Sequence, residues 1–230
     1  MNQIIDLTHV IDPEAAGRKF HLATIGANEV NHKVVRLENQ WYIMHDIEMV
    51  SHIGTHIEAP YHLFRDRADL AEVSIEQFCG NGVLLDLRGA PPKAELSLAQ
   101  IKAAAEQAGG VRSGDIVLCN LGYSKKYGAP EYGECPYFSN EAIVWLAEQG
   151  IHALGVDAGG VEIPASELHE NHAALFSRDV LLIENLANLD ALPSNGFTVF
   201  AMPVPIKKLE AFPLRVFAWM DGQESQKKDL

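Results

Sequence analysis

The sequence predicts an α/β fold in which a mixed β-sheet packs against helices. Short apolar runs bounded by turn residues recur along the chain, and two well-capped helical segments lie between them. The order strand, helix, strand occurs twice, which favours α/β units with some parallel pairing. No linker rich in Pro, Gly or Ser divides the chain, so we expect one domain over residues 1–222 and a polar tail over 223–230.

The predicted strands are short apolar runs that end at turn residues. They are 3–7, 82–87, 115–119, 151–156, 180–184, 197–201 and 214–219. The segment 34–50 mixes β-branched and polar residues and is predicted to form a hairpin. The first third of the chain is poor in helical patterns, so we expect an antiparallel layer there.

The predicted helices begin at capping residues. Ser97 and Gln100 form a capping box ahead of an Ala-rich segment that ends at two glycines. Ser139 can cap a second helix whose apolar residues recur on one face, and Gly150 can end it. A shorter box at Ser74 predicts a helix of one or two turns.

Composition excludes several classes of function. The chain has 230 residues, with 18 Lys and Arg against 31 Asp and Glu, and a net charge of −13. This acidic balance argues against nucleic-acid partners and anionic membrane surfaces. Three cysteines without CxxC spacing predict neither a disulfide framework nor a four-cysteine zinc site. We find no secretory signal pattern and no apolar run long enough to span a membrane, so we expect a cytoplasmic protein.

The strongest chemical signal is a histidine cluster. His52, His56, Glu58 and His62 lie within eleven positions. On a helix, His52 and His56 would share a face, but the glycine between them and Pro60 argue against a helix. A metal site is the favoured interpretation of three histidines and a carboxylate so close together. A structural or pH-sensing histidine cluster is the alternative.

An extended segment would bring the same residues together. His56 and Glu58 at positions i and i+2 of a strand point the same way, and Gly54 lets the backbone turn so that His52 returns to the same point. Two imidazoles and a carboxylate suit Zn²⁺, Mn²⁺ or Fe²⁺ equally well. His62 would then remain as a base.

Other polar residues form weaker candidates. His169 and His172 are a pair that spacing alone could equally expose to solvent, and Glu184 ends an apolar run as a satisfied polar group often does. Asp157 ends a predicted strand, where it either belongs to a site or caps a tight turn. Neither a GxGxxG pattern nor a P-loop or GxSxG elbow is present in the sequence.

The cluster carries a resemblance to a known family. The run His52-x-Gly54-Thr55-His56-x-Glu58-x-Pro60-x-His62 resembles the HxGTHxDxPxH signature of the putative cyclase family, which includes kynurenine formamidase (arylformamidase) and isatin hydrolase. The resemblance extends over nearly the whole chain. It covers 4–9, 154–157, 172–175 followed by 184–186, 202–203 and 213–216.

This resemblance implies a swivelling β/β/α fold and a metal-dependent hydrolase that cleaves a C–N amide bond. It implies one or two divalent ions, Zn or Mn, and a small-molecule substrate. His52, His56 and Glu58 would hold the first ion, and Glu58, His172 and Glu184 the second. His62 would be the catalytic histidine, and His169 a bystander. The resemblance also implies a homo-oligomer, a dimer or tetramer.

The chain departs from the family pattern in places. Glu58 stands where the family usually has Asp, and loops that shape the substrate pocket differ. Enzymes acting on an imide, a lactone or a dehydratable acid, and a metal-binding module without turnover, therefore stay as alternatives. Asp6 and Asp157 are candidates to fix the imidazole tautomers. Residues 18–20 (Arg-Lys-Phe) are candidates for a mobile substrate loop or an exposed linker.

Overall fold

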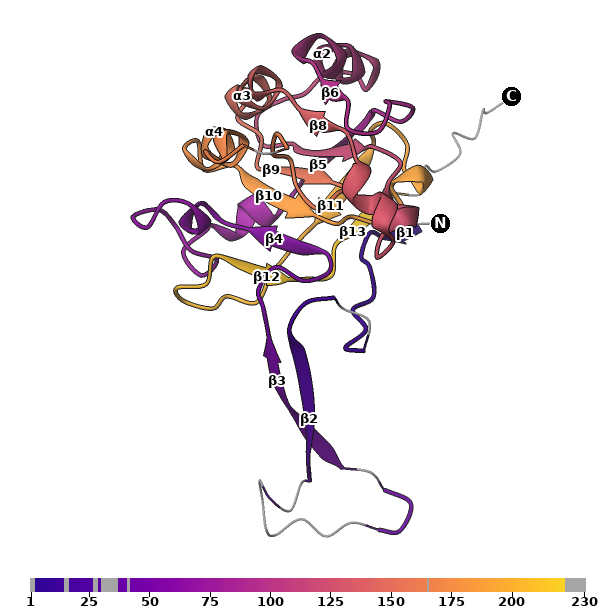
Figure 1. Cartoon of the computed structure of the whole chain (residues 1–230), viewed down its shortest axis with the longest axis vertical. Helices are drawn as coiled ribbons and strands as arrows, with labels where there is room; N and C mark the ends of the chain where they lie inside the picture. Colours follow the sequence, from indigo (N-terminus) through magenta and orange to yellow (C-terminus); the bar gives the residue numbers. More distant parts are fainter. Residues whose placement is uncertain are drawn as a thin grey trace, which may run out of the picture.

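A nine-stranded mixed sheet forms the centre of the computed structural model, which describes residues 3–14, 17–26, 29, 37–40, 42–164 and 166–221 (Figure 1). In spatial order its strands are β1 (Gln3–Asp6), β13 (Phe217–Met220), β11 (Phe197–Phe200), β5 (Cys79–Asp86), β7 (Ile116–Asn120), β9 (Ala153–Val156), β10 (Leu181–Glu184), β4 (His56–Glu58) and β12 (Ala211–Pro213). The four central strands β5, β7, β9 and β10 are parallel, and the flanking pairs are antiparallel. The expected α/β class is thus confirmed.

Every predicted strand overlaps an observed one, but several short strands were not predicted. The first is β4, which coincides with the histidine cluster, and the second is β12, its neighbour at the sheet edge. Two more, β6 (Glu95–Leu96) and β8 (Tyr137–Phe138), form a small parallel pair. Strands this short carry too few residues for an alternating pattern to be visible in the sequence.

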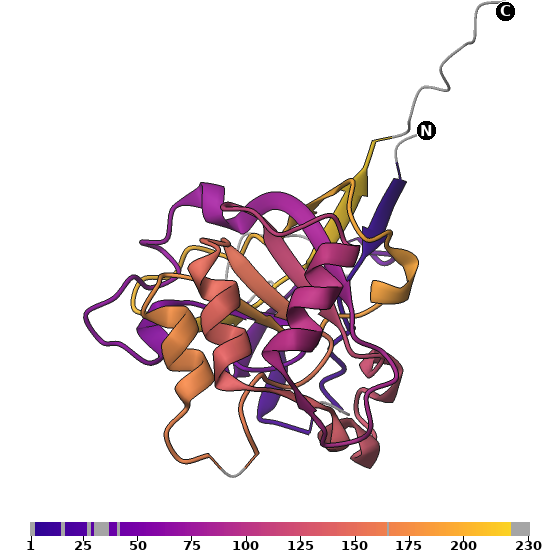
Figure 2. The same ribbon diagram turned by 90° about the horizontal axis from the view of Figure 1, so that it is seen from above.

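Three helices cover one face of the sheet, as the view from above shows (Figure 2). They are α2 (Leu98–Gln107), α3 (Asn140–Glu148) and α4 (Glu170–Phe176). The capping box at Ser97 is present, and the Ser139 hydroxyl accepts the Ala142 N–H. A short helix follows Ser74 as predicted, but it is a 3₁₀ helix (Ile75–Phe78), and the predicted capping box is wrong because Ser74 makes no side-chain cap hydrogen bond.

Hydrophobic side chains are buried on both faces of the central strands. Successive residues alternate between two clusters: Val117 and Cys119 of β7 pack with the helices, whereas Ile116 and Leu118 pack on the opposite face with β1, β11 and β13. Burial on both faces explains why these strands are continuous apolar runs in the sequence. No described helix is long and apolar enough to cross a membrane.

A two-stranded arm projects from the body (Figure 1). It consists of β2 (Phe20–Gly26) and β3 (Ile43–Met49), paired antiparallel along their whole length. The hairpin expected within 34–50 is therefore wrong in extent, because 43–49 pairs with 20–26 instead. The described residues do not include 30–36 or 41, nor the expected tail at 223–230.

Asp69 joins its own loop to the loop that precedes β12. Its Oδ1 accepts the N–H groups of Ala71 and Glu72 at 2.8 and 3.0 Å, and its Oδ2 accepts the Lys208 N–H at 2.5 Å. Burial alone would raise the pKa of this carboxyl, but the three backbone donors outweigh it and hold the pKa below its ordinary value. The ionised form of Asp69 therefore stabilises the folded state.

We expect Asp69→Asn to lower the free energy of unfolding by about 1–2 kcal/mol at pH 7, because the amide has one acceptor oxygen where the carboxylate has two, so that at least one of the three backbone donors loses its acceptor. A lowered folded pKa means that this stability is present above about pH 4 and is lost as the pH falls through the folded pKa. Urea unfolding of the variant and the parent at pH 7 and at about pH 3.5 tests this. The difference in free energy of unfolding between parent and variant should be smaller at low pH. The control variant Asp66→Asn, at an exposed neighbouring position, should have the same free energy of unfolding as the parent. An equal difference at both pH values would contradict the role of the carboxylate.

Candidate metal centre

Strand β4 places two predicted ligands on one face of the sheet. His56 and Glu58 are two residues apart and both are buried, at 2% and 1% exposure. The antiparallel register sets Glu184 of β10 directly opposite His56, and the His56 Nε2 lies 3.4 Å from a Glu184 carboxylate oxygen. Sheet pairing therefore brings together His56 and Glu184, which are 128 positions apart in the sequence.

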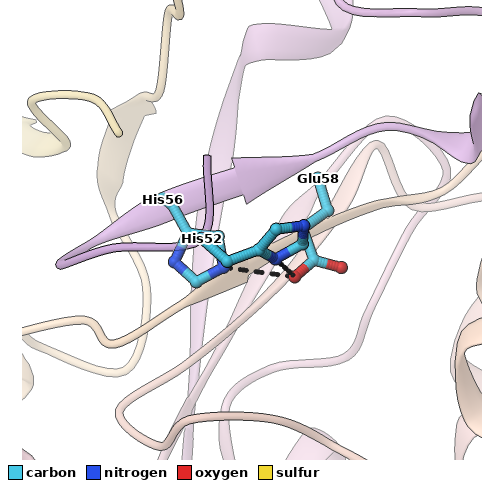
Figure 3. A group of neighbouring side chains, drawn as sticks. All are labelled: His52, His56 and Glu58. Carbon is cyan, nitrogen blue, oxygen red and sulfur yellow. Dashed lines mark hydrogen bonds and ion pairs between the residues drawn. The ribbon is translucent and has the colours of Figure 1, made fainter. Parts of the chain in front are cut away.

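The turn before β4 brings His52 back to the same point. Gly54 has a φ of 62°, and a Cβ added there would lie 2.5 Å from the Ile11 Cγ1 atom, so glycine is required twice over. The His52 Nδ1 consequently lies 3.0 Å from the Glu58 Oε1, and the His56 Nε2 lies 3.2 Å from the same oxygen (Figure 3). This is the geometry that the sequence spacing predicts.

Helix α4 supplies His172 from the helix-covered face. The His172 Nε2 lies 3.4 Å from the Glu58 Oε2. The helix begins without a side-chain cap of its own, since His169 precedes it in a left-handed conformation. Glu162 replaces the cap: its carboxylate accepts the N–H groups of Asn171 and His172 at 3.4 and 2.8 Å. A cap supplied from outside the helix explains why the sequence did not predict α4.

Each of the three imidazoles turns one nitrogen toward Glu58 and the other toward an acceptor. The outer nitrogen of His56 faces the Gly54 carbonyl at 2.9 Å, and that of His172 faces the Glu162 carboxylate at 2.6 Å. The outer nitrogen of His52 lies 3.5 Å from a Glu210 carboxylate oxygen. Metal-binding histidines show this arrangement, because the outer acceptor holds the proton away from the inner nitrogen.

The two aspartates proposed to orient the imidazoles are elsewhere. Asp157 is fully buried and accepts the N–H groups of Leu121 and Tyr123 at 2.7 and 2.8 Å, so it caps a turn. Asp6 pairs with Arg215 at 2.5 Å. That expectation is wrong, and Glu162 and Glu210 take the positions instead. Neither stands in a recognisable motif, so the sequence offered no signal for them.

The buried carboxylates and imidazoles of the cluster shift one another's pKa values. Burial would raise the pKa of Glu58, but contacts with His172, His52 and His56 hold it well below the usual range. Burial, and then the Glu58 charge, raise the pKa of Glu184. Burial lowers the pKa of His172, but the contacts with Glu162 and Glu58 outweigh burial and raise this pKa to about 10. The Glu58 Oε2 is buried and makes no hydrogen bond among the described residues. A divalent cation fits these donors, because it would satisfy that oxygen and offset both carboxylates.

His62 stands at the rim of the cluster. It follows Pro60 in a short 3₁₀ turn, and its ring centroid lies 4.6 Å from that of His52 and 5.9 Å from that of His172. Its side chain is exposed, yet the protein atoms around the ring displace enough water to lower its pKa. Its ligand atoms lie within 4.8 Å of those of Glu58 and His172, and also of His52 and Glu210. His169 is likewise near Glu162 and His172.

A cavity of about 530 Å³ opens beside the cluster. Its lining includes His52 and Glu184 from the cluster, two tyrosines (Tyr127 and Tyr132) and Arg18. Of the expected substrate loop 18–20, Arg18 alone lines this cavity; Lys19 pairs with Glu48, and Phe20 begins β2. The cavity is large enough for a small aromatic molecule.

Comparison with known proteins assigns the chain to a family. A family model described as "Putative cyclase" matches residues 5–163. The chain belongs to this cyclase family. Two kynurenine formamidases are related to it: that of Erythrobacter litoralis, 28% identical over 158 residues (69% of this chain, 68% of the relative), and that of Bordetella pertussis, 25% identical over 170 residues (74% and 77%).

Solved structures of other proteins share the fold of this chain. Isatin hydrolase A from Labrenzia aggregata, bound to benzyl benzoate, superimposes with a TM-score of 0.82 at 27% identity and covers 95% of this chain and 94% of that one. A protein described as a predicted metal-dependent hydrolase, from Bacillus stearothermophilus, has a TM-score of 0.72 at 25% identity, with 95% and 98% covered. The family and fold that the histidine motif indicates are therefore confirmed.

Glu162 offers a test of the outer contacts. We expect Glu162→Gln to weaken metal binding roughly 10- to 100-fold, because an amide holds the His172 tautomer less firmly than a carboxylate. Competition with a chelating dye measures the affinity. Glu167→Gln, a change on the exposed loop before α4, is the matched control. Unchanged affinity in Glu162→Gln would show that His172 does not depend on this contact.

Proposed function

We propose that this cyclase-family chain is a metal-dependent hydrolase that cleaves a C–N amide bond. His52, His56 and Glu58 hold one divalent ion, Zn²⁺ or Mn²⁺, and Glu58, His172 and Glu184 hold a second. The observation that carries the proposal is the convergence of three imidazole nitrogens on the two oxygens of one buried carboxylate. Nitrogen and oxygen donors in this proportion suit Zn²⁺ and Mn²⁺ alike.

The remaining residues carry proton transfer and binding. When bound, the ion supplies Lewis acidity, which lowers the pKa of water and polarises a carbonyl group. His62 accepts the proton of the attacking water at a ring nitrogen and returns it to the leaving nitrogen. Its position at the exposed rim, beside His52 and next to His172, suits this exchange. Tyr127 and Tyr132 line the cavity and provide apolar surface for an aromatic ring.

The proposed substrates are an aryl formamide such as N-formylkynurenine or a cyclic amide such as isatin. The names of the related kynurenine formamidases and of isatin hydrolase A support this choice. An aromatic or strained amide also releases its nitrogen more readily than an alkyl amide does. An imide, a lactone or a dehydratable acid is the alternative substrate. A binding module without turnover is the alternative class.

The decisive experiment combines elemental analysis with a hydrolysis screen. Purified protein is reconstituted with Zn²⁺ or Mn²⁺ and assayed with N-formylkynurenine, isatin, an imide and a lactone. We expect up to two ions per chain and turnover of an amide. If only the imide or the lactone is hydrolysed, the proposed amide substrate is wrong and the alternative substrate class replaces it. Tight metal binding without turnover of any compound would favour the binding module.

We further propose that the chain forms a homo-oligomer through the β2–β3 arm. The register places Phe20 opposite Met49 and Leu22 opposite Ile47, so one face of the ribbon is apolar. Leu22 and Ile47 are 42% and 60% exposed. A two-stranded ribbon alone is marginal in water, so a second copy of the chain covering this face would stabilise it. The proposed assembly is a dimer or a tetramer.

The double variant Leu22→Lys with Ile47→Lys is expected to shift the oligomer to a smaller species, because it places charges at the centre of the apolar face. Light scattering after size-exclusion chromatography measures the mass. His21→Lys with Glu48→Gln, on the opposite face of the same ribbon, is the control. If the parent is a monomer, or the Leu22/Ile47 double variant keeps its mass, the arm is not the interface.

We propose that the protein works in the cytoplasm on small molecules, without nucleic-acid or membrane partners. Its three cysteines, Cys79, Cys119 and Cys135, are free thiols. Its net charge of −13 repels phosphate backbones and anionic lipids. Cell fractionation with a tagged chain tests the location.

A further inference from the structure

Arg18 is a cation whose charge is not balanced by the residues around it. Its Nη1 donates a hydrogen bond to the His52 carbonyl oxygen at 2.7 Å. A guanidinium carries five N–H groups, and a carbonyl oxygen is neutral. Among the described residues, no carboxylate forms an ion pair with Arg18, whereas its neighbour Lys19 pairs with Glu48. Arg18 therefore keeps donors available at the wall of the cavity that it lines.

The two acidic residues that line the same cavity, Asp12 and Glu184, make contacts with groups other than Arg18 among the described residues. Asp12 accepts the Glu14 N–H at 2.9 Å, and Glu184 faces the His56 Nε2 at 3.4 Å. The contact with the His52 carbonyl places the cation next to a proposed metal ligand, since the His52 Nδ1 lies 3.0 Å from the Glu58 Oε1.

Aromatic surface lies in the same cavity. Tyr127 stacks on His9 with ring centroids 4.1 Å apart, and Tyr132 packs edge-on against Tyr127 at 5.4 Å. Both rings are held in place, because the Tyr132 hydroxyl also donates to the Asn185 Oδ1 at 2.8 Å. Rigid rings of this kind bind an apolar or aromatic group at little cost in entropy.

We propose that Arg18 binds an anionic group of the substrate, so that the preferred substrate is an aromatic amide that carries a carboxylate. The guanidinium matches a carboxylate with two parallel N–H donors. That the substrate is an amide rests on the proposed function. The anion site at Arg18 does not depend on which bond is cleaved. The competing explanation is that Arg18 merely fastens its loop to His52.

Binding of non-reacting probes tests the site without turnover. The metal-loaded protein is titrated calorimetrically with 3-phenylpropionate and with its neutral counterpart 3-phenylpropanol. Arg18→Gln is expected to weaken binding of the acid roughly 10- to 100-fold and that of the alcohol less than about twofold, as for loss of a charged hydrogen-bonded pair. Arg18→Lys should retain part of the preference for the acid over the alcohol, and the control Lys19→Gln should retain the whole preference.

Three results would overturn the proposal. The parent protein does not bind the acid more tightly than the alcohol, Arg18→Gln leaves the acid's affinity unchanged, or it weakens both probes alike. The second would mean that the carboxylate is held by the metal, and the third that Arg18 only fastens its loop.

Kinetics then separates this proposal from the hydrolase assignment. With N-formylanthranilate and the neutral formanilide as substrates, Arg18→Gln should raise KM for the former roughly 10- to 100-fold and change kcat little. A KM change equal for both substrates contradicts the anion site. If neither compound is hydrolysed by any form while the acid probe retains its dependence on Arg18, the anion site stands and this amide-hydrolase assignment falls.

Discussion

Glu58→Ala is expected to reduce turnover roughly 10³-fold or more and to lower the metal content of the purified protein. Among the described residues, Glu58 is the one whose two oxygens both face imidazole nitrogens of the cluster: those of His52 and His56 at 3.0 and 3.2 Å, and that of His172 at 3.4 Å. Alanine removes the negative charge that both proposed ion sites share. The measurements are elemental analysis and initial rates on the same preparation.

Glu58→Asp refines this result. The shorter side chain withdraws the carboxylate by roughly 1–1.5 Å in a site packed around the longer one. We expect the variant to keep part of its metal but to change its rate or its preference between Zn²⁺ and Mn²⁺. Glu106→Ala, on the exposed side of α2, is the control. Wild-type metal content and rate in Glu58→Ala would remove Glu58 from the ligand set.

His62→Asn is expected to lower kcat roughly 10²- to 10⁴-fold while the metal content stays at the parent level. The reason is its position: the exposed ring lies at the rim of the cluster, with its centroid 4.6 Å from that of His52. Asparagine keeps a polar side chain but cannot exchange a proton near neutral pH. Initial rates and elemental analysis are measured together, with His21→Asn on the arm as the control.

The two readouts distinguish the possible roles of His62. Loss of turnover with full metal content supports a base. Parallel loss of metal and turnover would make His62 a ligand, which its proximity to Glu58 and His172 would accommodate. Retention of both would exclude His62 from the chemistry.

Most of the fold was predictable because the central strands are buried on both faces. Runs such as 116–120 are apolar throughout, and helix starts such as Ser97 carry their own caps. Elements that depend on distant partners were not predictable. Helix α4 receives its cap from Glu162, and β2 is stabilised by pairing with β3 rather than by a core. Local sequence propensities do not reflect contacts with residues that are distant in the chain.

The candidate site likewise contains some contacts that the sequence predicts and others that it does not. The convergence of His52, His56 and Glu58 was predictable, because a strand period of two and a glycine turn are local properties. The other contacts of the site are visible only in the folded chain: Glu184 lies opposite His56, the His172 of α4 lies against Glu58, and Glu162 and Glu210 face the outer nitrogens. These contacts join positions far apart in the chain. Sheet register and helix packing set them, and both are determined by the burial of the whole core rather than by any local pattern.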